Sequence, residues 1–324
     1  MRKKQKRSFF SFLLAWFKIM KIADCAIVIP TFYPGKKIIS CLNSLPSECS
    51  IVIIDNGNDS ELEKIIANHP KKILHYKIGD VGLPKSFNFA LKNLNKEYFL
   101  ITQPDVIFKN DCLQNLLLAY KKYQNAGAIS PLIYENNLYS TSDYMDLKFD
   151  KISKKVNKSK KLNKTSIEPS GDFCVEAINA TAVLLKKSII EKIGGWDENI
   201  YTYLEDVDLS LRIRAAGHEI IKVSNSKVDH GGFQSHKKNN FENMNISRNW
   251  HFCWSSIYFN YKHATKLNFY KYYCYIFFKY FIKMIINFFL FRKIKFIKYQ
   301  TRFKACLNFL FIRKSNFRPT IDNI

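Results

Sequence analysis

The 324-residue sequence has few acidic residues, few glycines and few prolines. Its 27 Asp and Glu face 51 Lys and Arg, which leaves a formal net charge of +24. A surplus of this size favours a negatively charged neighbour, which can be nucleic acid, anionic lipid or a phosphorylated substrate. With 11 glycines and 9 prolines there are few turn formers, so long helices and strands are expected. The 47% apolar content excludes a wholly disordered or collagen-like chain, and the length predicts at most about two domains.

The sequence also lacks the short motifs of several common functional classes. None of the eight cysteines forms a Cys-x-x-Cys pair, so we expect reduced, buried thiols of a cytosolic protein rather than a disulfide framework or a zinc site. No G-x-G-x-x-G follows the first expected strand, and no G-x-x-x-x-G-K-[ST] is present. The usual dinucleotide-binding and P-loop classes are therefore excluded.

Neither end of the chain has a long uninterrupted apolar run. A basic N-terminal cluster precedes the apolar segment Phe9 to Phe17, but Lys18 and Lys21 cut it short and no small-residue cleavage site follows. We expect residues 1–20 to be a short interfacial anchor rather than an export signal. A start of the natural chain at Met20 remains an alternative.

The C-terminal region, residues 251–324, combines lysine, arginine and aromatic residues with a single acid, Asp322. A spanning helix needs about 20 apolar residues with few charges, and four cations interrupt this segment. On a helix, the lysines can lie on a different face from the apolar residues, which favours a helix lying on an anionic membrane surface. A true membrane span, a nucleic-acid-binding arm and ordinary core packing stay open. The residues concerned are the cations Lys271, Lys279, Lys283 and Arg292 and the apolar Phe278, Ile282 and Ile285.

The middle of the chain alternates short β-branched runs with helical patterns. This alternation predicts βαβ units on a mostly parallel sheet, hence an α/β fold. Ser60 and Glu63 form a candidate capping box for the second helix. The expected strands are Cys25–Pro30, Ser50–Asp55, Lys72–Lys77, Tyr98–Thr102 and Ala128–Ser130, and the expected helices are Lys36–Leu45, Glu61–Asn68, Leu83–Leu94 and Asp111–Tyr123.

Polar residues follow three of the expected strands. Pro30 and Thr31 end the first, Asp55 ends the second, and Gln103-Pro104-Asp105 follows the fourth. A single Asp after a strand is more often a turn residue, but ligands of parallel sheets bind at the carboxyl ends of the strands. Several such residues at one edge therefore predict a binding site. The lysine-rich segment 140–171 is expected to be a loop beside it, either a passive insertion or a lid that grips the acceptor.

Acidic residues cluster around residue 205. A helix beginning near Glu205 would bury a stripe formed by Leu209, Ile213 and Ala216. Glu205 and Asp206 then occupy its first turn, where the helix dipole favours the ionised carboxylate that a general base requires. Simple helix capping remains the alternative.

Two further features accompany this cluster. Asp208 and Arg212 stand at i, i+4 and predict an ion pair. His230 follows the expected strand Glu219–Val223 and precedes two glycines, which let the backbone approach a metal or phosphate closely. A structural role is the alternative for His230 and is the expectation for His236.

Six segments in order resemble an inverting family 2 glycosyltransferase of the GT-A fold, near its rhamnosyltransferase-like branch. They are AIVIPTF, IVIIDNG, DVGLPKSFNFAL, FLITQPDVIF, GGWDENIYTYLEDVDLSLRIRAAG and DHGGFQS, and the resemblance covers about residues 24 to 262. It implies a mostly parallel sheet flanked by helices. We expect a catalytic domain at 21–250, after the extension 1–20 and before the membrane-associating helices of 251–324.

The resemblance also implies roles for individual residues. Asp206 would be the catalytic base, and Glu205 would orient the acceptor or the base. Asp105 would hold Mg²⁺ or Mn²⁺ on the donor diphosphate, with His230 completing the metal or diphosphate site. Gln103 stands where a carboxylate or Asn is usual, Lys85 replaces a glycine, and Asn179-Ala180-Thr181 replaces a small-residue turn. The implied nucleotide-sugar contacts are Pro30, Thr31, Asp55, Asp80, Asn88 and Asp105.

The implied activity is transfer of one sugar from a dTDP-rhamnose-like or UDP-sugar donor to a glycan or polyprenyl-linked acceptor in cell-surface polysaccharide synthesis. The Gln-x-x-Arg-Trp signature of processive synthases is missing, which points to single-sugar addition. We expect a cytoplasmic enzyme peripheral on the inner face of the cell membrane, with no nucleic acid partner. The alternatives are a nucleotidyltransferase of related sheet architecture and a non-enzymatic basic membrane- or RNA-binding protein.

Overall fold

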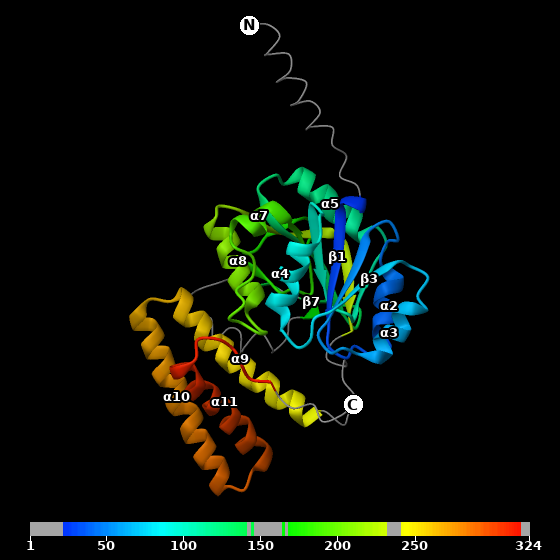
Figure 1. Ribbon diagram of the computed structural model, residues 1–324. Helices are drawn as coiled ribbons and strands as arrows, with labels where there is room; N and C mark the ends of the chain where they lie inside the picture. Colours follow the sequence, from blue (N-terminus) through cyan, green and yellow to red (C-terminus); the bar gives the residue numbers. More distant parts are fainter. Residues whose placement is uncertain (1–21, 141–143, 146–163, 166–167, 232–240, 319–324) are drawn as a thin grey trace, which may run out of the picture.

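The computed structural model describes residues 22–140, 144–145, 164–165, 168–231 and 241–318 (Figure 1). The expected N-terminal anchor, the alternative start at Met20, most of the lysine-rich loop and His236 lie outside these residues.

Helices flank a central sheet, and three further helices follow it. The helices of the sheet domain are α2 (Lys37–Ser44), α3 (Ser60–Ala67), α4 (Leu83–Asn93), α5 (Cys112–Lys122), α7 (Lys187–Lys192) and α8 (Glu205–Ala215), after the short 3₁₀ turn Ile22–Asp24.

Eleven of the described strands form one mixed sheet, whose main path runs β10-β13-β6-β12-β4-β1-β2-β3. β1 pairs in parallel with β2 and β4, whereas β12 is antiparallel to β4 and β6. The strands of this sheet are β1 (Cys25–Thr31), β2 (Ser50–Asp55), β3 (Ile73–Lys77), β4 (Tyr98–Thr102), β5 (Val106–Phe108), β6 (Ala126–Glu135), β7 (Leu138–Ser140), β9 (Lys164–Thr165), β10 (Phe173–Cys174), β12 (Ala182–Lys186) and β13 (Glu219–His230). β8 (Tyr144–Met145) and β11 (Ala177–Ile178) pair separately.

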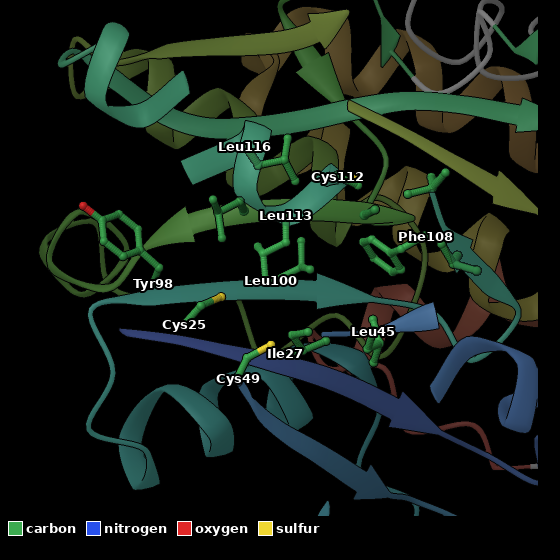
Figure 2. Packing of buried hydrophobic residues seen from close by; sticks show 14 of the residues in the cluster. Cys25, Ile27, Leu45, Cys49, Tyr98, Leu100, Phe108, Cys112, Leu113 and Leu116 are labelled. Carbon is green, nitrogen blue, oxygen red and sulfur yellow. The ribbon is translucent and has the colours of Figure 1, made fainter. Parts of the chain in front are cut away.

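The sheet lies between two apolar cores because its central strand is buried on both faces. Every residue of β1 is buried. Cys25, Ile27 and Ile29 pack with α2 and α5 on one face (Figure 2), whereas Ala26 and Val28 pack with α4 and α8 on the other. A strand that is covered on both faces has a continuous run of apolar residues in its sequence. The sequence of β1 shows this pattern. The predicted α/β sheet flanked by helices is confirmed.

Some local expectations are wrong. Helix α3 is capped by Asp59, whose side chain accepts from the Glu61 backbone N–H, so Ser60 and Glu63 form no capping box. Ala216 is exposed at the C-cap of α8 and takes no part in its buried stripe. β6 is longer than expected, and β13 continues to His230, so the segment from Lys227 is part of the strand rather than a loop after it. Six of the eight thiols are buried, but Cys174 and Cys274 are exposed.

The C-terminal helices are α9 (Phe241–His263), α10 (Lys266–Phe289) and α11 (Lys293–Phe311). We call α10 and α11, residues 266–311, the C-terminal hairpin; it extends away from the sheet domain (Figure 1). The expected boundary between residues 250 and 251 falls inside α9. Trp254 of α9 is fully buried in a core shared with Tyr280 and Phe309 of the hairpin. Within the described residues, no helix has both the length and the apolar character needed to cross a membrane.

Candidate functional site

A cavity of about 260 Å³ opens at the carboxyl end of β1, where α9 passes beneath the sheet. Three of the residues expected to bind the nucleotide sugar, Pro30, Thr31 and Asp80, line it. The Thr31 hydroxyl is buried and has no hydrogen-bond partner among the described residues. The other lining residues are Phe32, Asn56, Gly82, Leu83, Tyr201, Thr202, Tyr203, Met244, Ser247 and Arg248.

Asp55 is not among the residues that line this cavity. Its fully buried carboxylate accepts from the backbone N–H of Gly57 at 2.9 Å and of Asp59 at 3.0 Å, and His75 Nε2 lies 3.3 Å away. These bonds shape the turn that places Asn56 in the wall. In this structure, Asp55 therefore supports the loop around the cavity.

Asn88 is also absent from the described cavity wall. Its amide donates to the Trp196 carbonyl and accepts from the Trp196 N–H, both at 2.9 Å. A Cβ at Gly195, where φ is +69°, would come within 2.6 Å of the Asn88 oxygen. Asn88 thus fixes the glycine turn that precedes Tyr201 and Tyr203.

Asp105 and His230 face each other because β5 pairs with β13. Val106 lies opposite His230 in the antiparallel register, and the Gly231 N–H donates to the Asp105 carbonyl at 3.2 Å. The Asp105 Oδ1 and His230 Nε2 atoms are 3.7 Å apart, and their side chains are 11% and 17% exposed. This separation exceeds a normal hydrogen bond. The two expected metal ligands therefore lie together, at the end of β4.

Glu205 and Asp206 begin α8 as expected. Two consecutive left-handed residues, Tyr203 (φ 67°) and Leu204 (φ 66°), precede them. Such strain in residues other than glycine is characteristic of functional sites. Asp206 is partly buried; its Oδ2 accepts from the Ala180 N–H at 3.1 Å and its Oδ1 from the Val207 N–H at 2.8 Å.

Burial governs the protonation of this pair. Glu205 Oε2 is buried and has no hydrogen-bond partner among the described residues. Desolvation, reinforced by the charge of Asp206, raises the pKa of Glu205 well above its usual value. Desolvation also raises the pKa of Asp206, against the backbone hydrogen bonds that lower it. The helix start was expected to favour the ionised forms, but burial acts in the opposite direction and shifts both pKa values upward.

The turn at residues 179–181 connects Asp206 to the edge of the sheet. Ala180 donates to Asp206, and the neighbouring Thr181 carbonyl accepts from the Thr102 hydroxyl at 2.9 Å. Thr102 ends β4, three residues before Asp105. Asp206, Asp105 and His230 therefore come to the same edge, the one at which the cavity opens.

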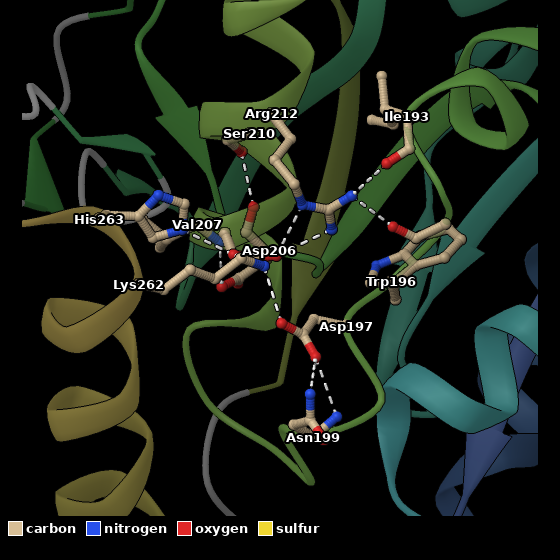
Figure 3. A network of polar contacts seen from close by, with 12 residues as sticks. Ile193, Trp196, Asp197, Asn199, Asp206, Val207, Ser210, Arg212, Lys262 and His263 are labelled. Carbon is tan, nitrogen blue, oxygen red and sulfur yellow. Dashed lines mark hydrogen bonds and ion pairs between the residues drawn. The ribbon is translucent and has the colours of Figure 1, made fainter. Parts of the chain in front are cut away.

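The expected ion pair of Asp208 and Arg212 is confirmed. It belongs to a larger network, in which Figure 3 labels Arg212, Lys262 and His263. Arg212 Nη2 lies 2.8 Å from Asp208 Oδ2, while Lys262 and His263 of α9 reach Oδ1 at 2.6 and 2.7 Å. Burial alone would raise the pKa of Asp208, but the hydrogen bond from His263 and the charges of Arg212 and Lys262 lower it to about 2. This network fastens α9 to α8.

The sequence analysis missed the cavity residues Tyr201, Tyr203 and Arg248. The Tyr201 hydroxyl donates to Asp80 Oδ1, which orients that carboxylate. Two features of the sequence could have indicated these residues. Tyr201 and Tyr203 occupy alternate positions just before Glu205, and Met244 and Arg248 stand at i, i+4, which places them on one helix face.

Comparisons with known proteins agree with this architecture. Residues 26–178 match the glycosyl transferase family 2. The rhamnosyltransferase WbbL of Escherichia coli (strain K12) is 30% identical over 196 residues, which are 56% of this chain and 72% of the relative. An N-acetylglucosaminyl-diphospho-decaprenol L-rhamnosyltransferase of Mycobacterium tuberculosis (strain CDC 1551 / Oshkosh) is 23% identical over 230 residues, 63% of this chain and 75% of the relative.

Among solved structures, GalNAc-T7 with UDP, GalNAc and Mn²⁺ superposes with a TM-score of 0.50 at 13% identity. The match covers 72% of this chain and half of that chain. At this identity the likeness shows the fold, a GT-A sheet, and nothing further.

Proposed function

Because the chain belongs to glycosyl transferase family 2, we propose that it transfers single sugars with inversion from a dTDP-rhamnose-like or UDP-sugar donor. The acceptor is a glycan or a polyprenyl-linked glycan in cell-surface polysaccharide synthesis. The observation that carries this proposal is that the cavity, the pair Asp105–His230 and Asp206 lie at one edge of the sheet. The rhamnosyltransferase names of two relatives, one on a decaprenol-linked substrate, support the donor and acceptor classes.

The donor nucleotide is proposed to occupy the cavity of about 260 Å³. Thr31 offers a buried hydroxyl that no described residue bonds, and a buried polar group without a partner calls for one. Tyr201 and Tyr203 add aromatic surface, and Asp80 adds an oriented carboxylate. Asp55 and Asn88 are proposed to act by holding the loops around the nucleotide.

Asp105 and His230 fit a divalent cation that the donor shares. Within the described residues no group of three or more His, Cys, Asp or Glu side chains could hold a metal ion. A two-residue site suits Mg²⁺ or Mn²⁺, because such ions are often held by one or two protein side chains together with substrate phosphates. The Asp105 oxygen and the His230 nitrogen, 3.7 Å apart, are suitable ligands. When bound, the cation acts as a Lewis acid that stabilises the departing diphosphate.

Asp206 is proposed as the general base. Its carboxylate takes the proton from an acceptor hydroxyl while that oxygen attacks the anomeric carbon and the bond to the diphosphate breaks. A single displacement of this kind inverts the configuration. The raised pKa of Asp206 makes it a stronger base, and a pKa nearer the working pH suits proton transfer. Glu205, buried directly before it, is proposed to orient the base.

The C-terminal hairpin is proposed to rest on an anionic membrane. Five apolar or aromatic residues repeat at spacings of three and four along α10 and are 39–70% exposed: Tyr275, Phe278, Ile282, Ile285 and Phe289. At the turn after them, Phe291 is 94% and Ile294 85% exposed, between exposed Arg292, Lys293 and Lys295. An apolar stripe bordered by cations suits the interface of anionic lipids.

Lys279 and Lys283, the lysines of α10 that were expected to lie toward the headgroups, are half-exposed. Lys279 rests over the ring of Tyr275, itself one of the exposed residues of α10, and Lys283 rests over the ring of Tyr299 of α11. The cations proposed to meet headgroups are therefore those of the α10–α11 turn. We propose a catalytic region of about 21–250 held by residues 251–324 at the cytoplasmic face of the cell membrane.

The proposal is tested with full-length protein, a panel of nucleotide sugars and a polyprenyl-linked acceptor, with Mn²⁺ or with EDTA. We expect one dTDP- or UDP-sugar to be consumed, the product to carry one inverted sugar, and EDTA to stop turnover. Stabilisation by nucleoside triphosphates instead of diphosphates in thermal-shift assays would favour a nucleotidyltransferase. Stabilisation by RNA alone would favour the non-enzymatic alternative.

A further inference from the structure

The chain returns to the cavity after the hairpin, in the segment 312–318. The Ser315 N–H donates to the Asn199 carbonyl at 2.9 Å, and the Ser315 hydroxyl meets His251 Nδ1 at 2.9 Å. The Phe317 ring stacks on Trp250 of α9, with centroids 5.1 Å apart and an angle of 18°. These contacts fix the segment against α9 and against the loop that leads to Tyr201.

Arg318, at the end of this segment, touches two residues of the cavity wall. Its guanidinium carbon lies 3.8 Å from the centre of the Tyr201 ring. Its Nε lies 3.7 Å from Asp80 Oδ2 and 3.4 Å from the Asp80 carbonyl oxygen. Since Tyr201 donates to Oδ1, each carboxylate oxygen of Asp80 has a partner.

The Tyr201 ring is held on its other side by His251. Their ring centres are 4.4 Å apart at an angle of 23°, and His251 is fully buried. Burial, and to a lesser degree the charge of Arg318, lower the pKa of His251 to about 3, so the ring beneath Tyr201 is neutral near pH 7. Arg318 therefore supplies the positive charge that touches Tyr201 and Asp80.

We infer that Arg318 is a positioning residue for the donor pocket, which holds Asp80 and Tyr201 in place and offsets the charge of Asp80 toward an anionic nucleotide. The inference rests on the proposed function, because it takes the cavity as the donor pocket. Without Arg318, the Tyr201 hydroxyl would be the one remaining partner of the Asp80 carboxylate among the described residues when a nucleoside diphosphate approaches. Like charges repel, so binding of the donor would weaken while the reacting groups stay in place.

Full-length Arg318→Ala and Arg318→Lys are compared with wild type and with Lys314→Ala. Lys314 is an exposed cation of the same segment, so its removal changes the net charge equally. The Kd of UDP and of dTDP with Mn²⁺ is measured by calorimetry, and the donor KM and kcat by turnover. Melting temperatures show that each variant is folded.

We expect Arg318→Ala to raise the Kd and the donor KM about threefold to tenfold, as for a partly exposed ion pair combined with a cation–π contact. Its kcat should stay within about twofold, Arg318→Lys should recover part of the affinity, and Lys314→Ala should bind like wild type. A folded Arg318→Ala with unchanged Kd and KM, or an equal loss in Lys314→Ala, would overturn the inference. If wild type binds no nucleotide, the proposed function fails and this inference with it.

Discussion

The sheet domain and the C-terminal hairpin use the same apolar residue types in opposite ways. All seven residues of β1 are buried between helices. Along α10, by contrast, the stripe from Tyr275 to Phe289 lies 39–70% exposed. Exposed apolar patches of this kind mark interaction sites. The sheet domain buries most of its apolar residues within the protein, whereas the hairpin leaves an exposed apolar face, which we propose rests on lipid.

The two regions also differ in charge. The sheet edge gathers Asp105, Glu205 and Asp206 in partly or fully buried positions. The hairpin, residues 266–311, contains no acid. The two regions therefore suit different partners: acids at the sheet edge fit a cation and a hydroxyl that loses its proton, and cations on the hairpin fit anionic headgroups. The predictions below separate the two functions.

The largest effect is expected from Asp206→Asn, which removes the proposed base and leaves the hairpin untouched. General base catalysis typically contributes about 10²–10⁴-fold, so kcat should fall by that factor. The Kd of the nucleotide and binding to anionic vesicles should not change. Single-turnover rates measure the loss of transfer, calorimetry measures the Kd of the nucleotide, and cosedimentation measures binding to vesicles. Glu191→Gln removes an exposed acid of α7 and serves as control. Turnover like wild type in folded Asp206→Asn would assign the base elsewhere.

Loss of the exposed tip of the hairpin should have the converse effect. In the double variant Phe291→Ser and Ile294→Ser, two exposed apolar side chains no longer enter the lipid. Burial of one such side chain contributes about 1.5–3 kcal/mol, and partial insertion less, so partition into anionic vesicles should fall about tenfold to a hundredfold. Cosedimentation measures the partition.

The matched control for the tip is Leu118→Ser, which removes an exposed apolar residue of α5 in the sheet domain. It should sediment with vesicles like wild type, and donor hydrolysis in solution should be unchanged in both variants. Equal losses in the two would mean that the hairpin has no special affinity for lipid. Point changes are preferable to deletion of the hairpin, because deletion would expose Trp254 and would take away the helices that lead to the segment carrying Arg318.

The sequence predicted the strands β1 to β4 well because the information for them is local, but it did not predict β12, which is antiparallel to β4 and β6 and makes the sheet mixed. β2 and β4 begin and end at the expected residues, since buried apolar runs bounded by turn residues define a strand. Asp206 and the pair Asp105–His230 were placed at the carboxyl edge by motif order. The supporting roles of Asp55 and Asn88 were not predictable, because a motif does not show which backbone groups occupy a side chain.

Contacts between distant segments were not accessible from the sequence either. Arg318 meets Asp80 across 238 positions, and no periodicity links them. The raised pKa of Glu205 depends on burial by several elements, so the helix position alone gave the wrong direction. Arg248 reaches the cavity because α9 packs beneath the sheet, in a region that the sequence analysis divided at residue 250.

An intermediate effect is expected at Asp208, where α8 and α9 join. Its pKa is about 2 in the fold and 3.8 ordinarily. A carboxyl group whose pKa is lowered in the fold stabilises the folded state at pH values above its ordinary, unfolded-state pKa. That contribution is lost as the pH falls toward the pKa in the fold. The free energy of unfolding should therefore drop by about 2 kcal/mol from this group between roughly pH 4 and pH 2.

Urea unfolding at several pH values, followed by tryptophan fluorescence, measures this loss because Trp250 and Trp254 lie in α9. In Asp208→Asn the corresponding part of the pH dependence should disappear, and the fold should be less stable at pH 7. The exposed pair Lys77–Glu63, with Glu63→Gln, provides a control with little expected effect. An unchanged pH profile in Asp208→Asn would mean that the network does not hold α9 to α8.

The smallest effect is expected from the cations at the hairpin turn. Lys293→Gln and Lys295→Gln each remove one charge beside Phe291 and Ile294. A cation near an anionic surface contributes about 1 kcal/mol, so each change should weaken binding to anionic vesicles roughly fivefold at low salt. The difference should shrink at high salt, because ions screen exposed charges, and vanish on neutral vesicles.

Lys72→Gln, at an exposed site of the sheet domain, removes the same charge and should have no effect. If Lys72→Gln weakens binding as much, net charge rather than the hairpin draws the protein to the membrane, and the contrast between the two regions is one of packing alone.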